Sequence, residues 1–287
     1  MMTSCLMVYF SNGGTTDRVA RSIAAGLSDM GCRVDLFNIK DDKPRTLDGY
    51  EILGIGSPVY YYRPTFNILD YLKELPDLKD KAFFSFILYG TYSYDALHKM
   101  EHILYSKGAR GLGSFQCFGE DYFLGYLKRG VLFSPNHPSE RELIEASVFG
   151  RDVSNCYKDN GPVKIEKQRG APLIYAMERF FLNQWLTKNF YSRLFKVDRA
   201  SCTSCGICME ECPVNNIADA KNGQPLWGNK CILCLACEYK CPENAISSPL
   251  NLPVFVPFMN YNVRQASADP EIENVRVKYS RDIIERI

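Results

Sequence analysis

The chain has 287 residues, 46% of them hydrophobic, and a formal net charge of +1 at pH 7. This length allows two domains with sizeable cores, and the near-neutral charge gives no basic field to argue for a nucleic-acid partner. With no run of 18 uninterrupted apolar residues and no signal-like apolar stretch after the first methionines, we expect neither a membrane span nor a secretory leader.

The N-terminal half predicts strands and helices in alternation. Residues 5–10 form a short continuous apolar run, as expected of a parallel strand that is buried on both faces. A helical pattern follows, in which apolar side chains recur at intervals of three and four residues. Further strands are expected at residues 33–37, 51–56, 82–88 and 114–118, and further helices after Pro64 and at residues 94–107 and 140–157. Five strands alternating with helices over about 155 residues predict an α/β fold with a doubly wound, five-stranded parallel sheet.

Three loops are expected at the carboxyl ends of these strands, where doubly wound sheets bind ligands. The first contains small residues and two glycines, so its backbone N–H groups can converge on a phosphate at a helix N-terminus. The other two are rich in aromatic residues and would form a slot for a flat ring. Together they predict an FMN site; the alternative is that the tyrosines are rim packing and the glycines a plain turn. The candidate residues are Ser11, Asn12, Gly13, Gly14, Thr15 and Thr16 in the first loop, Ser57, Pro58, Val59, Tyr60, Tyr61 and Tyr62 in the second, and Tyr89, Gly90, Thr91, Tyr92 and Ser93 in the third.

Two aromatic segments do not belong to the predicted alternation of strands and helices. Residues 117–138 exceed an ordinary connection and leave the sheet near the expected ring site, so we expect them to shield the ring or to form a substrate or partner surface. Within them, His137 is interpreted as a turn residue. Residues 172–195 have helical character and are expected to pack between two domains. The alternative is an amphipathic face for a membrane or a partner subunit.

Eight of the twelve cysteines lie within forty residues, in two runs of identical spacing, C-x₂-C-x₂-C-x₃-C-P. Each member of the second run follows its counterpart by 29 residues, and the match extends to two later positions, where Asn215 and Ile217 correspond to Asn244 and Ile246. This internal duplication predicts two [4Fe–4S] clusters, with the fourth cysteine of each run binding the other cluster. The predicted ligands are Cys202, Cys205, Cys208 and Cys241 for one cluster, and Cys231, Cys234, Cys237 and Cys212 for the second.

Zinc and disulfides are weaker explanations of this pattern. Zinc sites show paired C-x₂-C knuckles or mixed Cys/His sets, and no histidine falls in the segment. A disulfide framework is typical of small secreted domains. The four remaining cysteines are expected to be buried free thiols in a reducing cytosol; they are Cys5, Cys32, Cys117 and Cys156.

The tail, with prolines followed by a charged stretch, predicts an irregular strap. Residues 108–113 contain three glycines, but they precede a strand and lack the order of a nicotinamide-binding loop. The predicted organisation is a doubly wound domain at residues 1–160, an aromatic helical linker at 161–197, a cluster domain at 198–250 and a C-terminal strap at 251–287.

The N-terminal half resembles a flavodoxin. Residues 11–16 stand where that family usually has S-G-T-G-N-T, and residues 56–60 and 90–92 resemble its second and third loops. The C-terminal segment resembles a bacterial two-cluster ferredoxin, so the chain is similar to the flavodoxin–ferredoxin fusions sometimes called the EFR1 family. The resemblance implies a flavodoxin-like sheet, a small α+β ferredoxin domain, FMN and two [4Fe–4S] clusters. Gly13 departs from the family pattern, because it replaces a threonine hydroxyl that should bind phosphate; Thr15 and Thr16 would have to compensate.

The expected function is electron transfer between FMN, two clusters and an external redox protein in the cytoplasm. No Cys/His or Ser/His/Asp group in the sequence suggests hydrolysis or covalent catalysis, so no catalytic residue is assigned. An alternative is an FMN-dependent reductase, fed through the clusters, that holds a small substrate with Tyr60, Tyr61, Tyr62 and residues 117–138. A redox sensor that signals to a partner is a third hypothesis. No nucleic-acid partner is expected, and a membrane partner is disfavoured.

Overall fold

The chain folds into two compact units in the computed structural model, which describes residues 3–41, 44, 46–159, 170, 172–220 and 223–279. The first unit comprises residues 1–120 and 136–175, and the second comprises residues 121–135 and 176–287. Residues 121–135, which interrupt the first unit in the sequence, therefore belong structurally to the second. The expected boundary between residues 160 and 161 lies outside the described residues.

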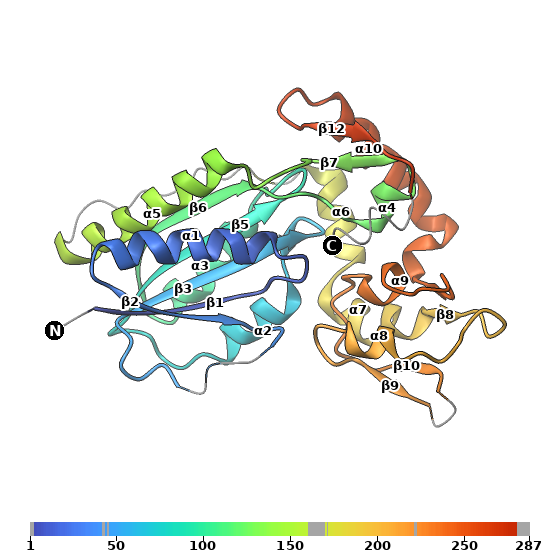
Figure 1. The fold of residues 1–287 in the computed structure, drawn as a ribbon, viewed down its shortest axis with the longest axis horizontal. Helices are drawn as coiled ribbons and strands as arrows, with labels where there is room; N and C mark the ends of the chain where they lie inside the picture. Colours follow the sequence, from blue (N-terminus) through green and yellow to red (C-terminus); the bar gives the residue numbers. More distant parts are fainter. Residues whose placement is uncertain are drawn as a thin grey trace. The chain divides into compact units, whose positions relative to one another are not determined.

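The first unit contains the doubly wound sheet that the sequence predicts (Figure 1). Five parallel strands lie in the order β2-β1-β3-β5-β6, and the two-residue strand β4 (Arg63–Pro64) pairs antiparallel with the end of β3. Their bounds are β1 Ser4–Tyr9, β2 Arg33–Asn38, β3 Ile52–Tyr60, β5 Ala82–Tyr89 and β6 Arg110–Phe118. The expected helices are present as α1 (Thr15–Asp29), α2 (Phe66–Glu74), α3 (Ala96–Ser106) and α5 (Glu140–Asp159).

Close packing of α1 against α5 covers one face of the sheet (Figure 1). A Cβ atom on Gly26 of α1 would lie 1.9 Å from the carbonyl oxygen of Ser147, so only glycine allows this approach. Between the helices and the sheet, Phe84 and Phe86 are completely buried. Because the strand order reverses between β1 and β3, the loops that follow these two strands open at the edge of the sheet where such folds bind ligands.

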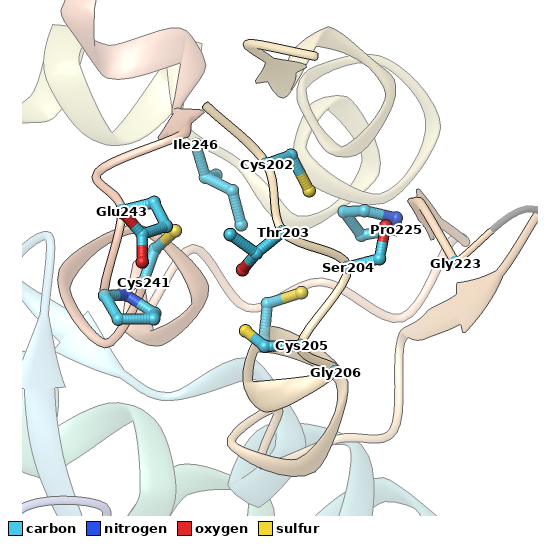
Figure 2. Close-up of a pocket in the computed structure, with 12 residues that line it drawn as sticks. Cys202, Thr203, Ser204, Cys205, Gly206, Gly223, Pro225, Cys241, Glu243 and Ile246 are labelled. Carbon is cyan, nitrogen blue, oxygen red and sulfur yellow. The ribbon is translucent and has the colours of Figure 1, made fainter. Parts of the chain in front are cut away.

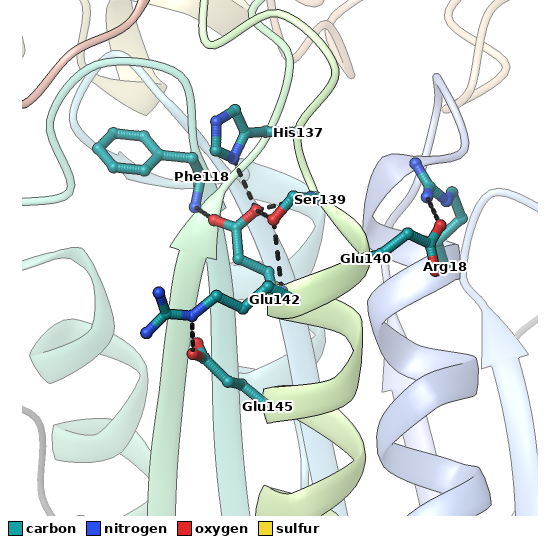
Figure 3. A network of polar contacts seen from close by, with 8 residues as sticks. Arg18, Phe118, His137, Ser139, Glu140, Glu142 and Glu145 are labelled. Carbon is teal, nitrogen blue, oxygen red and sulfur yellow. Dashed lines mark hydrogen bonds and ion pairs between the residues drawn. The ribbon is translucent and has the colours of Figure 1, made fainter.

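Glu142 ties the end of β6 to the beginning of α5 (Figure 3). Its Oε1 accepts a hydrogen bond from the backbone N–H of Phe118 at 3.1 Å, and its Oε2 accepts one from the N–H of Ser139 at 2.7 Å. The Ser139 hydroxyl lies 2.8 Å and His137 Nδ1 2.6 Å from the same Oε2. Ser139 and Glu142 thus form a capping box, and His137 has a structural role in the loop before the helix.

The second unit is built from short elements. Helix α6 (Leu173–Phe181) carries the chain from the first unit into it, and α7 (Gln184–Asn189) and a 3₁₀ turn (Tyr191–Leu194) follow. These confirm the helical character predicted for residues 172–195 where the structure describes them. The cysteine segment consists of two antiparallel strand pairs and two short helices: β8 (Lys196–Val197) with β11 (Ile246–Ser247), β9 (Ile217–Asp219) with β10 (Pro225–Trp227), α8 (Ile207–Glu210) and α9 (Ala236–Tyr239).

The prediction of an irregular C-terminal strap is wrong for the described residues. They form α10 (Val256–Ala268), which buries Met259 and Ala266, and β12 (Asn274–Arg276). The prolines of the tail were interpreted as excluding a helix. Pro257 is compatible with one because it lies in the first turn of α10, where its missing N–H costs no helical hydrogen bond.

Residues 121–135 also form more than a loop. They contain α4 (Leu124–Leu127) and β7 (Val131–Phe133), and β7 pairs antiparallel with β12. Lys128 Nζ lies 2.5 Å from Oε1 of Glu238, a buried carboxylate one residue after Cys237. The segment is therefore fastened both to the C-terminal strand and to the cysteine region. Within the described residues, no helix has both the length and the apolar character that crossing a bilayer requires.

We expect Glu142→Gln to lower the free energy of unfolding by about 1–2 kcal/mol at pH 7, because the amide cannot accept all the bonds that the carboxylate accepts. Burial raises the pKa of Glu142, but hydrogen bonds from Ser139 and His137 lower it more, and the net pKa is below the usual range. A carboxyl with a lowered folded-state pKa stabilises above its unfolded pKa, and this contribution is lost as the pH falls through the folded value. The difference between wild type and variant should therefore shrink in acid.

Urea unfolding at pH 7 and at about pH 4 measures this effect. Glu140→Gln is the matched control, since this carboxylate is exposed and lies 3.8 Å from Arg18 (Figure 3). A Glu140 variant as unstable as the Glu142 variant, or a loss at Glu142 that is equal at both pH values, would contradict the assignment.

Candidate functional site

The 29-residue repeat of the sequence is also a repeat of backbone conformation. Three positions of left-handed φ recur in register, and each short helix begins directly after the second of them. The equivalent hydrogen bonds recur too, since the N–H of Asn215 donates to the carbonyl of Cys212 at 3.0 Å and that of Asn244 to the carbonyl of Cys241 at 3.1 Å. The paired φ values are 56° at Ser204 and 54° at Leu233, 82° at Gly206 and 61° at Leu235, and 49° at Asn215 and 50° at Asn244.

The left-handed residue before each short helix makes a tight, concave turn of the backbone in the cysteine region. Such concave turns favour anions and are common at iron–sulfur sites. At Leu235 the conformation is adopted by a buried, non-glycine residue, which costs free energy. The surrounding packing therefore holds this turn in place.

Four cysteines from both repeats line one pocket (Figure 2). Cys202, Cys205 and Cys208 come from the first run, and Cys241 comes from the end of the second. The pKa of the Cys208 thiol is raised to about 11, first by burial and then by Cys241, Cys205 and Cys202 as neighbouring negative charges. The shared pocket places these four cysteines together.

The other four cysteines form a second, more buried group. Burial raises the pKa of Cys231 to about 12, with Cys212 of the first run contributing as a neighbouring charge. The pKa values of Cys234 and Cys237 are also raised, first by burial and then by the other members of this group. In the first group, three cysteines of one repeat and one of the other line the same pocket. The assignment of all eight cysteines to two clusters stays a prediction.

Backbone N–H groups point at the sulfur atoms in both sets. The N–H of Asn216 lies 3.2 Å from Cys212 Sγ, and the equivalent N–H of Ala245 lies 3.3 Å from Cys241 Sγ. The N–H of Leu233 lies 3.4 Å from Cys231 Sγ. Such donors stabilise thiolates, so both sets suit a group that binds cysteine in its ionised form.

The two sets differ in exposure. In the first set Cys205 is exposed and Cys202 is half-buried, whereas in the second Cys212, Cys231 and Cys237 are all buried. Across the described residues no three His, Cys, Asp or Glu side chains are grouped closely enough to hold a single metal ion. A cubane cluster is larger than one ion, so its four sulfur ligands are spaced more widely than those of a zinc site.

The phosphate-loop candidates are held by β2. Asn38 Oδ1 accepts the N–H of Ser11 at 3.0 Å, and Asn38 Nδ2 donates to the carbonyl of Ser11 at 2.9 Å. Gly14 has a φ of 83° and no heavy atom within 4 Å of the position a Cβ would take. Gly14 has no side chain to cap α1, and the Ser11 hydroxyl accepts the N–H of Asp17 in the first turn at 3.2 Å. Helix N-termini favour anions. Thr16, expected to compensate for Gly13, is buried.

The two aromatic loops meet at a cluster of tyrosine rings. Tyr62 and Tyr94 lie 5.5 Å apart between ring centroids, and Tyr92 stacks on Tyr94 at 5.3 Å. Tyr175, at the first turns of α6, lies 4.5 Å from Tyr62 and 5.2 Å from Tyr94. Sequence reasoning missed Tyr175 at this site, because nothing in the aromatic run distinguished it from residues that pack elsewhere.

The other ring-loop candidates have different surroundings. The Ser57 hydroxyl is buried, donates to the carbonyl of Pro58 at 2.8 Å and accepts the N–H of Thr65 at 3.0 Å, so it holds the loop itself. Ser93 Oγ lies 3.1 Å from Gln116 Oε1. Two of the tyrosines pack against phenylalanine rings: Tyr60 edge-on against Phe10, and Tyr89 against Phe118. Thr91 is buried, and three further candidates are half-buried, namely Val59, Tyr61 and Gly90.

Comparisons with known proteins match both parts of the chain to domain models. Residues 6–121 match the model of the flavodoxin domain, and residues 201–246 match the model of the 4Fe-4S dicluster domain. An uncharacterized protein of Methanocaldococcus jannaschii is 28% identical over 143 residues, which cover 48% of this chain and 89% of that protein. A flavodoxin from the domain Archaea is 19% identical with a TM-score of 0.45, covering 54% of this chain and 99% of its own. Flavodoxin 1 of Bacillus cereus is 16% identical with a TM-score of 0.43, covering 53% and 98%.

A doubly wound sheet with a phosphate-type loop, followed by two four-cysteine sets, defines a two-domain electron-transfer protein. The chain is a flavodoxin–ferredoxin fusion, whose two domains imply FMN and iron–sulfur clusters. The narrower assignment to the EFR1 group stays a prediction. The four cysteines outside the motifs, Cys5, Cys32, Cys117 and Cys156, are buried free thiols, as expected.

We expect Cys208→Ser and Cys241→Ser to remove the same cluster, although the two residues belong to different repeats. Each variant should retain about half of the iron, since one of two four-iron clusters remains, and flavin content should not change. Cys212→Ser should remove the other cluster. Iron analysis and electron paramagnetic resonance (EPR) spectra of the reduced proteins check this, with Cys32→Ser as the control outside the motifs. If Cys241→Ser and Cys212→Ser lost the same signal, the exchange of ligands between repeats would be wrong.

We expect Asn38→Ala to weaken FMN binding about tenfold, because the loop at Ser11 loses two hydrogen bonds that together hold its shape. Quenching of FMN fluorescence by the flavin-free protein measures the affinity. Asn189→Ala is the control, because Asn189 is exposed and its Nδ2 bonds only the carbonyl of Trp185, at 2.9 Å. Equal affinities of wild type and Asn38→Ala would show that the clamp does not position the phosphate loop.

Proposed function

We propose that this protein relays electrons between FMN bound to the first unit, two [4Fe–4S] clusters bound to the second, and an external redox protein. The observation that carries the proposal is the presence, in one chain, of a flavodoxin domain and of two complete four-cysteine sets. FMN exchanges one or two electrons whereas each cluster exchanges one, so a chain that holds both converts between two-electron and one-electron partners.

The cysteines of the second unit would bind the two clusters. Cys202, Cys205, Cys208 and Cys241 would bind one cluster, and Cys231, Cys234, Cys237 and Cys212 the second. The N–H groups of Leu233, Asn216 and Ala245 would stabilise the thiolate ligands. Their nitrogen atoms lie 3.2–3.4 Å from cysteine sulfur atoms, which supports this role. Because the first set includes the exposed Cys205, we assign exchange with the external partner to that cluster.

In the first unit, the loop of residues 11–16 would bind the FMN phosphate with its N–H groups and the N-terminus of α1. The tyrosines of the two aromatic loops would flank the ring. The support for this assignment is the N-terminus of α1 at Gly14, the open space there and the meeting of Tyr62, Tyr92 and Tyr94. Since the same tyrosines would also border a substrate beside the ring, reduction of a small molecule is the second function to test.

We expect protein purified without oxygen to contain about eight irons and one FMN per chain, and to take up about four electrons, one for each cluster and two for the flavin. Iron, acid-labile sulfide and flavin analysis followed by a dithionite titration checks the count. The reduced protein should then return these electrons to cytochrome c, used as a model acceptor.

Each other outcome has a definite meaning. Eight irons without flavin would leave a ferredoxin whose flavodoxin domain is empty. Full reduction without transfer to any acceptor protein would contradict the relay and favour a sensor. Catalytic consumption of a small molecule by the reduced protein would favour the reductase.

A further inference from the structure

The second unit contains a buried donor with no acceptor. The indole Nε1–H of Trp227 is completely shielded from solvent and has no hydrogen-bond partner in the part of the chain that the structure describes. Leaving such a group unsatisfied is energetically unfavourable. The indole is also held firmly, since its ring stacks on Phe195 with centroids 5.1 Å apart and planes 9° apart. Its N–H therefore has a fixed direction.

Trp227 lies beside the ligand segment of the buried cysteine set. It is the last residue of β10 and pairs with Ile217 of β9. The next residue, Gly228, donates its N–H to the carbonyl of Asn216 at 2.7 Å, and Asn216 donates its own N–H to Cys212 Sγ at 3.2 Å. The backbone thus connects Trp227 to a member of the second set through two hydrogen bonds.

Among the described residues, the first cysteine set has no side-chain donor at the equivalent strand position. The repeat relates Ile217 to Ile246, and the strand that pairs with Ile246 is β8, where Val197 is the partner. Val197 thus occupies the place that Trp227 occupies in the other half. Valine has no side-chain donor, so the duplication breaks its symmetry at this position.

We propose that the Trp227 indole N–H donates a hydrogen bond to a sulfur atom of the second cluster, and that it raises the reduction potential of that cluster alone. This inference rests on the proposed function, because it requires the cluster held by Cys212, Cys231, Cys234 and Cys237. Reduction adds negative charge to the cluster, and a donor aimed at its sulfur stabilises the reduced form. Burial of the second set opposes reduction, so Trp227 offsets that effect.

The test is Trp227→Phe in the full-length protein with both clusters loaded. Phenylalanine keeps the aromatic stacking on Phe195 and removes the donor. In a redox titration followed by EPR, one of the two midpoint potentials should shift to a lower value and the other should not move. Trp185→Phe is the matched control, because Trp185 is the only other tryptophan and is 69% exposed; it should leave both potentials unchanged.

The outcomes separate this inference from the function on which it rests. Wild-type protein that binds no iron would refute the proposed clusters themselves. Full iron in all three proteins, with both potentials unchanged in Trp227→Phe, would refute the hydrogen bond and leave the relay intact.

A second measurement applies if Trp227→Phe fails to fold. Trp185→Phe protein labelled with ¹⁵N in the indole should show a nitrogen coupling to the reduced cluster by electron–nuclear double resonance. Absence of that coupling would overturn the proposal.

Discussion

In the second unit, cysteines of both 29-residue repeats line one pocket, and the rest of that unit depends on this exchange of cysteines between the repeats. Neither repeat can complete a set alone, so the two halves must pack against each other. The paired left-handed residues and the matching N–H···S contacts follow from that requirement. Even the unfavourable backbone conformation at Leu235 is retained, because the chain must turn there as it turns at Gly206.

The sheet could be predicted from the sequence because its signals are local. Strand β1 is buried along its whole length and α1 presents its apolar residues on one face, so short windows of sequence contain the information. Residues 121–135 and the tail could not be predicted in this way. Strand β7 has three residues and pairs with β12, which lies more than a hundred residues later. Neither strand is long enough to show an alternating pattern, and only the folded unit brings them together.

In the candidate site, too, local sequence patterns could be predicted and long-range contacts could not. The cysteine spacing indicates which residues can surround a cluster, so the pocket that cysteines of both runs share could be predicted, and so could the glycine-containing loop before α1. The residues that support these groups were not. Asn38 clamps Ser11 from another strand, Tyr175 joins the tyrosine cluster from beyond the sheet, and Trp227 looks like any aromatic strand residue until β10 is paired with β9. Long-range pairing determines all three roles.

Duplication gives two sites of the same shape, whereas an electron relay needs sites that differ. A more exposed cluster is accessible to a partner, and a buried one is protected from solvent but harder to reduce. The chain creates this difference with few substitutions, because the backbone and the N–H···S contacts of the two halves are alike. The residues that pair with the equivalent Ile217 and Ile246 are Trp227 and Val197. Together with the different exposure of the two sets, this strand position would give the clusters different surroundings without any change of ligands.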